Sequence, residues 1–356
     1  MKKFVKVLWI LAACMAALGI LITAGGFAWC MRVVDRLTPD KSVPMVSPID
    51  IYAVDTLQID LGVGDVKFEM DDEARIEATG YAENDLKIEQ EGNVVRVVGR
   101  DTVGGSHILN LGLFRVDWLG RLHTGTLEKR VVTVYLPKRM EFAQLDIATD
   151  TGDISGKLIG GFAEKAVFAC ETGKISISEL SCEELVCESS TGNIRLEDVY
   201  SGQSAVIGCN TGNVTAVDCD WAELTLNGGT GSHTFEACTV SESAMMENGT
   251  DDVRIKGGSW KDLKLDVGTG SAEFEGHLEG QCEVTASTGD VKLRLDEDAS
   301  QYTAELHVST GKCEVQGADM VQMGKKEYAV NPGASMPNEL KIDVSTGDIV
   351  LVFAQE

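Results

Sequence analysis

The sequence is poor in positive charge. It has 31 Lys and Arg against 56 Asp and Glu, a formal net charge of −25 over 356 residues. Nucleic-acid binding needs clustered Lys and Arg that displace counterions, so this balance argues against a nucleic-acid partner. Aromatic residues are also scarce, at 6%, whereas 38 residues are Gly and 44% are hydrophobic. This mixture favours closely packed, frequently turning structure over long globular helices.

The usual patterns of metal and catalytic sites are missing as well. No C-x-x-C occurs, and the His residues are scattered: His107, His123, His233, His277 and His307. A zinc site needs Cys and His pairs at ligand spacing. Calcium-binding nonapeptide repeats are absent too. The sequence therefore predicts no metal, no cofactor and no catalytic residue.

One long uncharged run lies near the N-terminus. Val7–Met31 is rich in Leu, Ile, Ala and Trp. At about 1.5 Å per residue it crosses the roughly 30 Å of a bilayer core. Three Lys precede it, and two Arg with one Asp follow it closely. The positive-inside rule then predicts a cytoplasmic tail (1–6), a single-pass transmembrane helix (7–31) and an extracellular C-terminal part at the cell membrane.

Two other readings of this segment stay open. Leu11–Cys14 matches the short pattern after which lipoprotein signal peptides are cut, and Ala24–Gly26 is a weak cleavage site for a secretory signal. Both conflict with the length of the uncharged run, so we favour an uncleaved anchor. Residues 32–49 are polar with three Pro and are expected to form a stalk.

A repeat of about 20 residues organises most of the remaining chain. Its mark is Thr-Gly, with Thr250-Asp251 filling one gap, and the Thr residues are Thr151, Thr172, Thr191, Thr211, Thr230, Thr250, Thr269, Thr288, Thr310 and Thr346. The positions six, four and two before each Thr, and three and five after it, carry no charge in any repeat. One repeat shows the set: Leu185, Cys187, Ser189, Ile194 and Leu196. This spacing by two predicts strands with one buried face on each side of the Thr-Gly corner.

Each repeat is too short for a strand, a helix and a second strand. Strands must therefore pair with their equivalents in neighbouring repeats, which predicts an all-β fold, a parallel β-solenoid with about 20 residues per coil. Gly takes the positive φ that a tight corner needs. Val63-Gly64-Asp65 repeats the corner with Val in place of Thr. The solenoid is therefore expected to begin near Ile51.

Both ends of the solenoid are predicted to be covered. Residues 50–140 hold the first coil, a hairpin over Asp85–Val98, a loop over 101–128 and a strand over Val131–Leu136. The regular solenoid spans 141–316. Residues 317–356 hold an insertion and the last coil, and the insertion is expected to cover the other end because bare solenoid ends invite strand addition.

These segments resemble a known group of proteins. Val132–Pro137, the run from Leu145 into Thr151-Gly152-Asp153-Ile154, and the closing Ile342–Ile349 are similar to the bacterial membrane-anchored β-strand-repeat family of candidate adhesins, some found in envelope-stress operons of the Lia type. The resemblance covers roughly residues 50–356. It implies a right-handed parallel β-solenoid on the cell surface, without an assigned reaction.

Seven cysteines fall on predicted inward positions, where they are interpreted as buried thiols: Cys170, Cys187, Cys209, Cys219, Cys238, Cys282 and Cys313. One pair has a second interpretation. Cys219 and Cys238 stand eight residues after the Thr of consecutive coils, about 4.8 Å apart, which is close enough for a disulfide. The Asp residues two after the Thr form no continuous row and are expected to be solvated: Asp153, Asp252, Asp290 and Asp348.

Two groups of apolar residues are candidate contact surfaces. Trp221, Val240 and Trp260 each lie about ten residues after the Thr of successive coils and would stack into an apolar strip for a sugar or protein partner. Packing of these side chains at a turn is the interpretation that we favour. The loop around Phe114 and Trp118 is expected to cover the coil end, with contact to a membrane or partner as its alternative.

The functional expectation is therefore a non-enzymatic, membrane-anchored binding or scaffold protein. Its partners would be the membrane and either an envelope protein or a surface glycan, in adhesion or in envelope-stress sensing. The alternative is a polysaccharide lyase or hydrolase of the β-helix kind, which needs convergent acidic or basic residues on long excursions from one face.

Overall fold

A computed structural model describes residues 45–49, 54–81, 85–99, 109–110, 114–116, 122–124 and 129–355. The chain divides into two compact units, one made of Met1–Val43 with Asp101–Glu128 and one of Pro44–Arg100 with Lys129–Glu356. The described part of the first unit is a small antiparallel sheet of β7 (Leu109–Asn110), β8 (Phe114–Val116) and β9 (Leu122–Thr124).

The helix predicted over 7–31 lies outside the described residues, as do the tail, most of the stalk and Trp118. Within the described ranges, no helix has the length and apolarity that a membrane crossing requires. The one helix there is the short 3-10 helix η1 (Ala299–Gln301), so the expectation of an all-β fold is confirmed.

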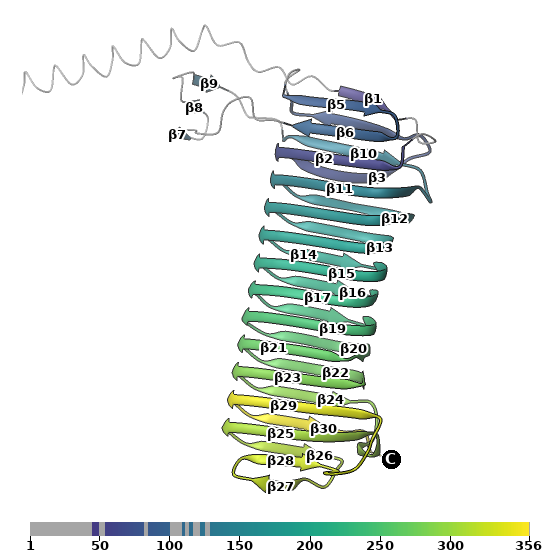
Figure 1. Ribbon diagram of the computed structural model, residues 1–356. Coiled ribbons are helices and arrows are strands. Elements are labelled where there is room, and N and C mark those ends of the chain that lie inside the picture. The colour runs from purple at the N-terminus through teal and green to yellow at the C-terminus, as the bar shows by residue number, and fades with distance from the viewer. Residues whose placement is uncertain are drawn as a thin grey trace, which may run out of the picture. The chain divides into compact units, whose positions relative to one another are not determined.

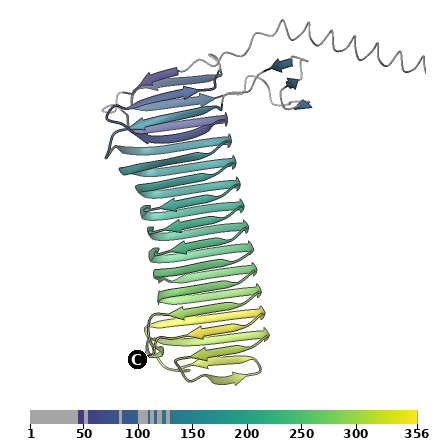
Figure 2. The ribbon, with the colours of Figure 1, turned by 180° about the vertical axis from the view of Figure 1, so that it is seen from behind.

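The second unit is a stack of coils, each with one strand before its Thr-Gly corner and one after it (Figures 1 and 2). The first sheet holds the strands before the corner, in the spatial order β5 (Leu86–Glu91), β6 (Val94–Gly99), β2 (Thr56–Val63), β11 (Glu141–Thr151), β12 (Ile154–Thr172), β13 (Ile175–Thr191), β15 (Tyr200–Thr211), β17 (Asp220–Thr230), β19 (Thr239–Thr250), β21 (Leu263–Thr269), β23 (Gln281–Thr288), β29 (Asn338–Thr346), β25 (Tyr302–Thr310), β28 (Glu327–Val330) and β27 (Val321–Gly324).

The second sheet holds the strands after the corner, and the long strands β12 and β13 bend to take part in both sheets. Its spatial order is β1 (Met45–Pro48), β4 (Arg75–Thr79), β10 (Val131–Leu136), β3 (Asp65–Met70), β12, β13, β14 (Ile194–Glu197), β16 (Val214–Val217), β18 (His233–Glu236), β20 (Val253–Lys261), β22 (Ala272–Glu279), β24 (Val291–Leu295), β30 (Ile349–Val352) and β26 (Cys313–Gln316).

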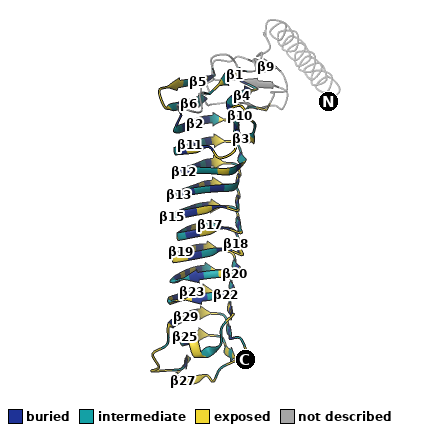
Figure 3. Ribbon diagram, turned by 90° about the vertical axis from the view of Figure 1, so that its right-hand side faces the viewer, coloured by how far each residue is buried: buried dark blue, intermediate teal, exposed yellow. Residues whose placement is uncertain are grey.

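Successive coils pair in parallel and in the register that the repeat predicts. Thr151 lies opposite Thr172, and Leu145 lies opposite Ala166. The early coil marked by Val63 is confirmed, since Val63 lies opposite Thr151. The positions six and four before each Thr are buried in every coil, and Figure 3 shows buried residues in the strands along the whole stack. The parallel pairing and the charge-free core are confirmed, whereas the handedness of the coils stays a prediction.

The corner glycines are required by the coil that precedes them. Gly192 has φ +144°, and a Cβ built on it would lie 1.8 Å from the carbonyl oxygen of Gly173. Most other corners repeat this close approach. Only residues without a Cβ tolerate such a contact, which explains why Gly marks the corner coil after coil.

The Asp and Asn residues after the corner accept backbone hydrogen bonds at the bend. The side chain of Asp153 accepts the backbone N–H of Lys174 at 2.9 Å, and that of Asn213 accepts the N–H of Ser232 at 3.0 Å. Asp252 does the same for Ser271. These side chains remain partly or fully accessible to solvent, and each also satisfies a backbone donor of the next coil.

The strands around the first coil pair with it in both sheets. β5 and β6 form the predicted antiparallel hairpin, and β6 pairs in parallel with β2. In the second sheet, β10 pairs with β3 and β4, and β1 pairs with β4. The hairpin edge strand β5 carries Lys87, Glu89 and Glu91, and charges of this kind protect an edge from further pairing.

At the other end, the chain is not threaded in sequence order. Thr346 lies opposite both Thr288 and Thr310, so the coil of β29 and β30 is inserted between its two predecessors. The last coil of the repeat in sequence is therefore not the last in the stack. The insertion supplies β28, which pairs antiparallel with β25, and β27, which pairs with β28. It covers the end as expected, and it also carries the chain back so that both edges of β29 are paired.

Candidate functional site

The predicted contact strip lies in the core. Trp221, Val240 and Trp260 do stack in register, but they are 2%, 1% and 0% exposed. Phe235 packs edge-on between the two indoles, with ring centroids 6.2 Å from Trp221 and 5.6 Å from Trp260. The strip prediction is wrong, because these side chains point inward where each coil re-enters the first sheet.

The cysteines behave mainly as buried apolar residues. Of the inward set, all but Cys313 are fully buried, and Cys182, which the repeat did not assign, is buried too. Burial raises the pKa of Cys182 to about 12 and that of Cys209 to about 11. Such thiols carry almost no thiolate at neutral pH, so they are poor nucleophiles and poor metal ligands. No group of three metal-binding side chains is found among the described residues.

A buried polar pair interrupts the core in the middle of the stack. The ring of His233 is fully buried, accepts the N–H of Val214 at Nδ1 (3.3 Å) and places Nε2 3.1 Å from Oδ1 of Asn248. The amide of Asn248 donates to the carbonyl oxygens of Asp251 (2.8 Å) and Thr250 (3.3 Å), which leaves Oδ1 to accept. His233 is therefore a neutral imidazole with its proton on Nε2.

We expect this imidazole to make stability depend on pH. Burial lowers the pKa of His233, against a smaller opposing effect of Asn248 and Asp251. Below about pH 6.5 the unfolded chain protonates this side chain while the folded chain does not. The free energy of unfolding should then decrease as the pH is lowered below about 6.5, by up to about 1.4 kcal/mol per pH unit.

Urea unfolding at about pH 7.5 and about pH 5.5 measures this slope. The double substitution His233→Val with Asn248→Val uses residues found at the same positions in other coils, and it should flatten the profile. His307→Gln is the matched control, because His307 is partly exposed and paired with Asp343. An equal slope in all three chains would contradict the assignment.

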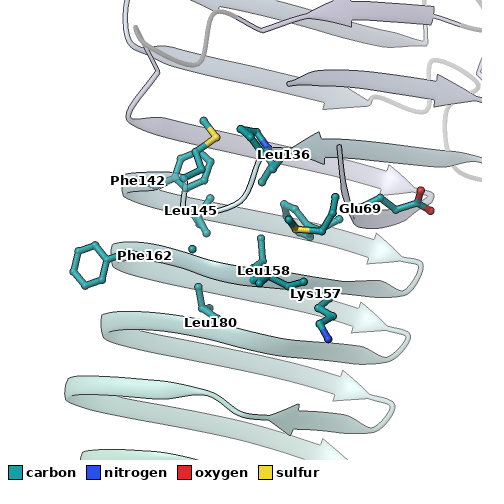
Figure 4. Close-up of a pocket in the computed structure, with 14 residues that line it drawn as sticks. Glu69, Leu136, Phe142, Leu145, Lys157, Leu158, Phe162 and Leu180 are labelled. Carbon is teal, nitrogen blue, oxygen red and sulfur yellow. The ribbon is translucent and has the colours of Figure 1, made fainter. Parts of the chain in front are cut away.

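A small hollow lies between strands β3, β10 and β11 and the bend of β12 near Leu158 (Figure 4). Its lining is apolar, with Leu136, Phe142 and Leu158, and it carries Glu69 and Lys157 at its border. The hollow has room for about one water molecule. That space is too small for a sugar ring or an organic cofactor.

The outer face of the first sheet carries a row that sequence reasoning missed. Val167, Val186, Val206, Thr225 and Met245 lie opposite one another on β12, β13, β15, β17 and β19. Their sequence neighbours are buried, so these side chains point outward; the first four are half-buried and Met245 is 49% exposed. We call this set the valine row. Comparing the residues five positions before each Thr in the sequence would have revealed the valine row.

Charged residues border the valine row. The row begins beside Asp146 and ends beside Lys264. On its two flanks, the charged outward positions are four acids and one cation: Glu184, Glu188, Glu223, Glu247 and Lys165, which pairs with Glu184 at 3.0 Å. An uncharged strip with a mainly acidic border on a chain of net charge −25 matches the apolar centre and polar rim of a protein interface.

Comparison with known proteins places the chain at family level. A search of curated proteins gives no match. Solved structures that resemble it include a candidate cell adhesion protein from Clostridium sporogenes (12% identity, TM-score 0.19, 88% of this chain and 100% of that one). Two candidate adhesins, from Bacteroides fragilis (10%, 0.34, 88% and 99%) and Parabacteroides distasonis (12%, 0.37, 87% and 97%), are also similar. The family model described as Toastrack DUF4097 matches residues 54–352, most of the chain, so the protein belongs to that family.

Proposed function

We propose that the protein is a non-enzymatic cell-surface scaffold that binds a protein partner through the valine row. The predicted helix over 7–31 would anchor it in the cell membrane, with the coils outside. The observation that carries the proposal is the in-register row of uncharged side chains on an otherwise strongly acidic chain. The partner should present an apolar centre with a mainly basic border, because most of the charged residues around the row are acids.

Binding is favoured over catalysis for a geometric reason. Glycoside cleavage needs two carboxyl groups facing each other across a substrate. The hollow beside Glu69 and Lys157 holds about one water molecule. A protein partner is favoured over a glycan because the row is aliphatic, and the tryptophans that had suggested a sugar platform are buried.

The experiment is site-specific photocrosslinking of the full chain in cells that naturally make it. A photoreactive residue replaces Val206 in the row, and in the control it replaces Thr215, which points outward from the second sheet. We expect a discrete crosslinked protein from position 206 and none from position 215. Val186→Asp in the 206-labelled chain should weaken the crosslink more than about tenfold, because it places a carboxylate in the contact.

Equal crosslinking from both positions, or no protein crosslink from position 206, would refute the proposal. The identity of the captured protein then separates the two roles. A membrane protein of the same envelope indicates stress-associated signalling, whereas a protein of another cell or matrix indicates adhesion. Circular dichroism of Val186→Asp checks that the β-structure is intact.

A further inference from the structure

Two thiols bracket the coil that carries the buried imidazole. Cys219 lies in the turn between β16 and β17, and Cys238 lies in the turn between β18 and β19. Both are fully buried. The segment between them is one complete coil of the stack, and it contains His233. It is thus the coil whose core departs most from apolar packing.

The two cysteines occupy the same position in consecutive coils. The N–H of Thr239 donates to the carbonyl oxygen of Cys219 at 2.9 Å, and Asp220 lies opposite Thr239. The preceding residues match as well, since Asp218 has φ +51° and Ala237 has φ +53°. Identical backbone geometry makes the two side chains point inward side by side.

The thiols also repeat each other's contacts. Cys219 donates to the carbonyl oxygen of Val217 at 3.3 Å, and Cys238 donates to that of Glu236 at 3.4 Å. The neighbouring Cys238 thiol, together with burial, raises the pKa of Cys219, and the Cys219 thiol lowers that of Cys238. In-register strands lie about 4.8 Å apart. That spacing is inside the Cα range of about 4.4–6.8 Å that a disulfide accepts.

No other pair of described cysteines has this relation. Cys170 and Cys209 share a column, but Ser189 lies between them, and Cys170 hydrogen-bonds that hydroxyl at 3.5 Å. Cys182 and Cys187 are on one strand. Among the described cysteines, Cys219 and Cys238 are therefore the one pair that is placed for a disulfide bond.

We propose that Cys219 and Cys238 are a modification site, forming a cross-coil disulfide that locks the coil between them. The oxidant is a disulfide, carried by an oxidoreductase or by glutathione. The two thiols lose two protons and two electrons as their sulfur atoms join, and the oxidant's disulfide takes them up to become two thiols. Because both cysteines end fully buried, the exchange takes place before the coil closes. An extracellular location would supply such oxidants.

The test refolds the reduced full-length chain with oxidised glutathione and then alkylates it under denaturing conditions. The chain has 10 Cys, so one bridge leaves 10 − 2 = 8 alkylated and all 10 after reduction. Peptide mapping should join Cys219 to Cys238. Amide exchange in β17 and β18 should slow more than about tenfold on oxidation, because local opening of the closed coil is restricted.

Cys219→Val is the informative variant, because Val199 fills the same position one coil earlier. This chain should refold and show no oxidation-dependent exchange, whereas Cys209→Val should keep it. Alkylation of all ten thiols, or a bridge between any other pair, would overturn the proposal. These readouts do not involve the valine row, so their failure leaves the partner proposal standing.

Discussion

Replacing Gly192 with Ala should lower the free energy of unfolding by about 3–5 kcal/mol. Two costs add. The backbone at φ +144° is nearly closed to residues with a Cβ, and that Cβ would lie 1.8 Å from a backbone oxygen of the preceding coil. The oxygen cannot move freely, because each strand is held by neighbours on both sides. Urea unfolding of the two chains measures the difference.

Gly92→Ala is the matched control. Gly92 also has a left-handed backbone, with φ +61°, but a Cβ there would meet nothing within 4 Å. Its cost should be about 1 kcal/mol, the price of the dihedral alone. Similar losses in the two variants would show that backbone conformation, and not the approach of the preceding coil, selects Gly at the corners.

Trp260→Ala should cost about 3–5 kcal/mol, as large aromatic truncations in a core do. Its side chain is fully buried and packs edge-on against Phe235, which also contacts Trp221. Removing the indole leaves a cavity between two coils that are held in register by their neighbours, so collapse around it is limited. The loss is measured by urea unfolding at neutral pH, where His233 is neutral in both states.

Tyr200→Ala provides the contrast, since Tyr200 is an aromatic residue three coils earlier and is 51% exposed. Its truncation should change stability by less than about 0.5 kcal/mol. If Trp260→Ala were equally mild, the indole would not be a core residue, and the exposed strip that the sequence suggested would regain support.

Most of the fold was predictable because inward and outward positions alternate at fixed distances from each Thr-Gly corner. Counting by twos from each Thr assigns the inward positions on both adjoining strands from Leu145 to Leu351, and most of them are buried, with Cys313 and Val315 of the edge strand β26 half-buried. The same rule failed for Trp221. The ladder shifts register between Trp221 and Glu223 and between Ser201 and Ser204, so strand parity does not continue from one Thr-Gly corner to the next.

The order of the last coils was hidden for a different reason. All coils present the same corner, so Thr310 and Thr346 are equally good neighbours for Thr288, and only three-dimensional packing decides between them. The contact of His233 with Asn248 could have been predicted from the sequence. Both residues occupy inward columns of adjacent coils, where their polarity stands out against Val253 and Val267 at the equivalent positions.

Because of the inserted coil, this end of the stack can fold only after β29 and β30 have been synthesised. Strands β25 and β26 are made before β29 and β30, yet their parallel partners are those later strands. A chain that stops before Asn338 would leave β23 and β25 with an empty place between them, and each would expose a row of unpaired backbone groups. The far end of the stack is thus closed by a coil that is synthesised after both of its neighbours. Chains without β29 and β30 would keep this end open and accessible to quality-control proteases.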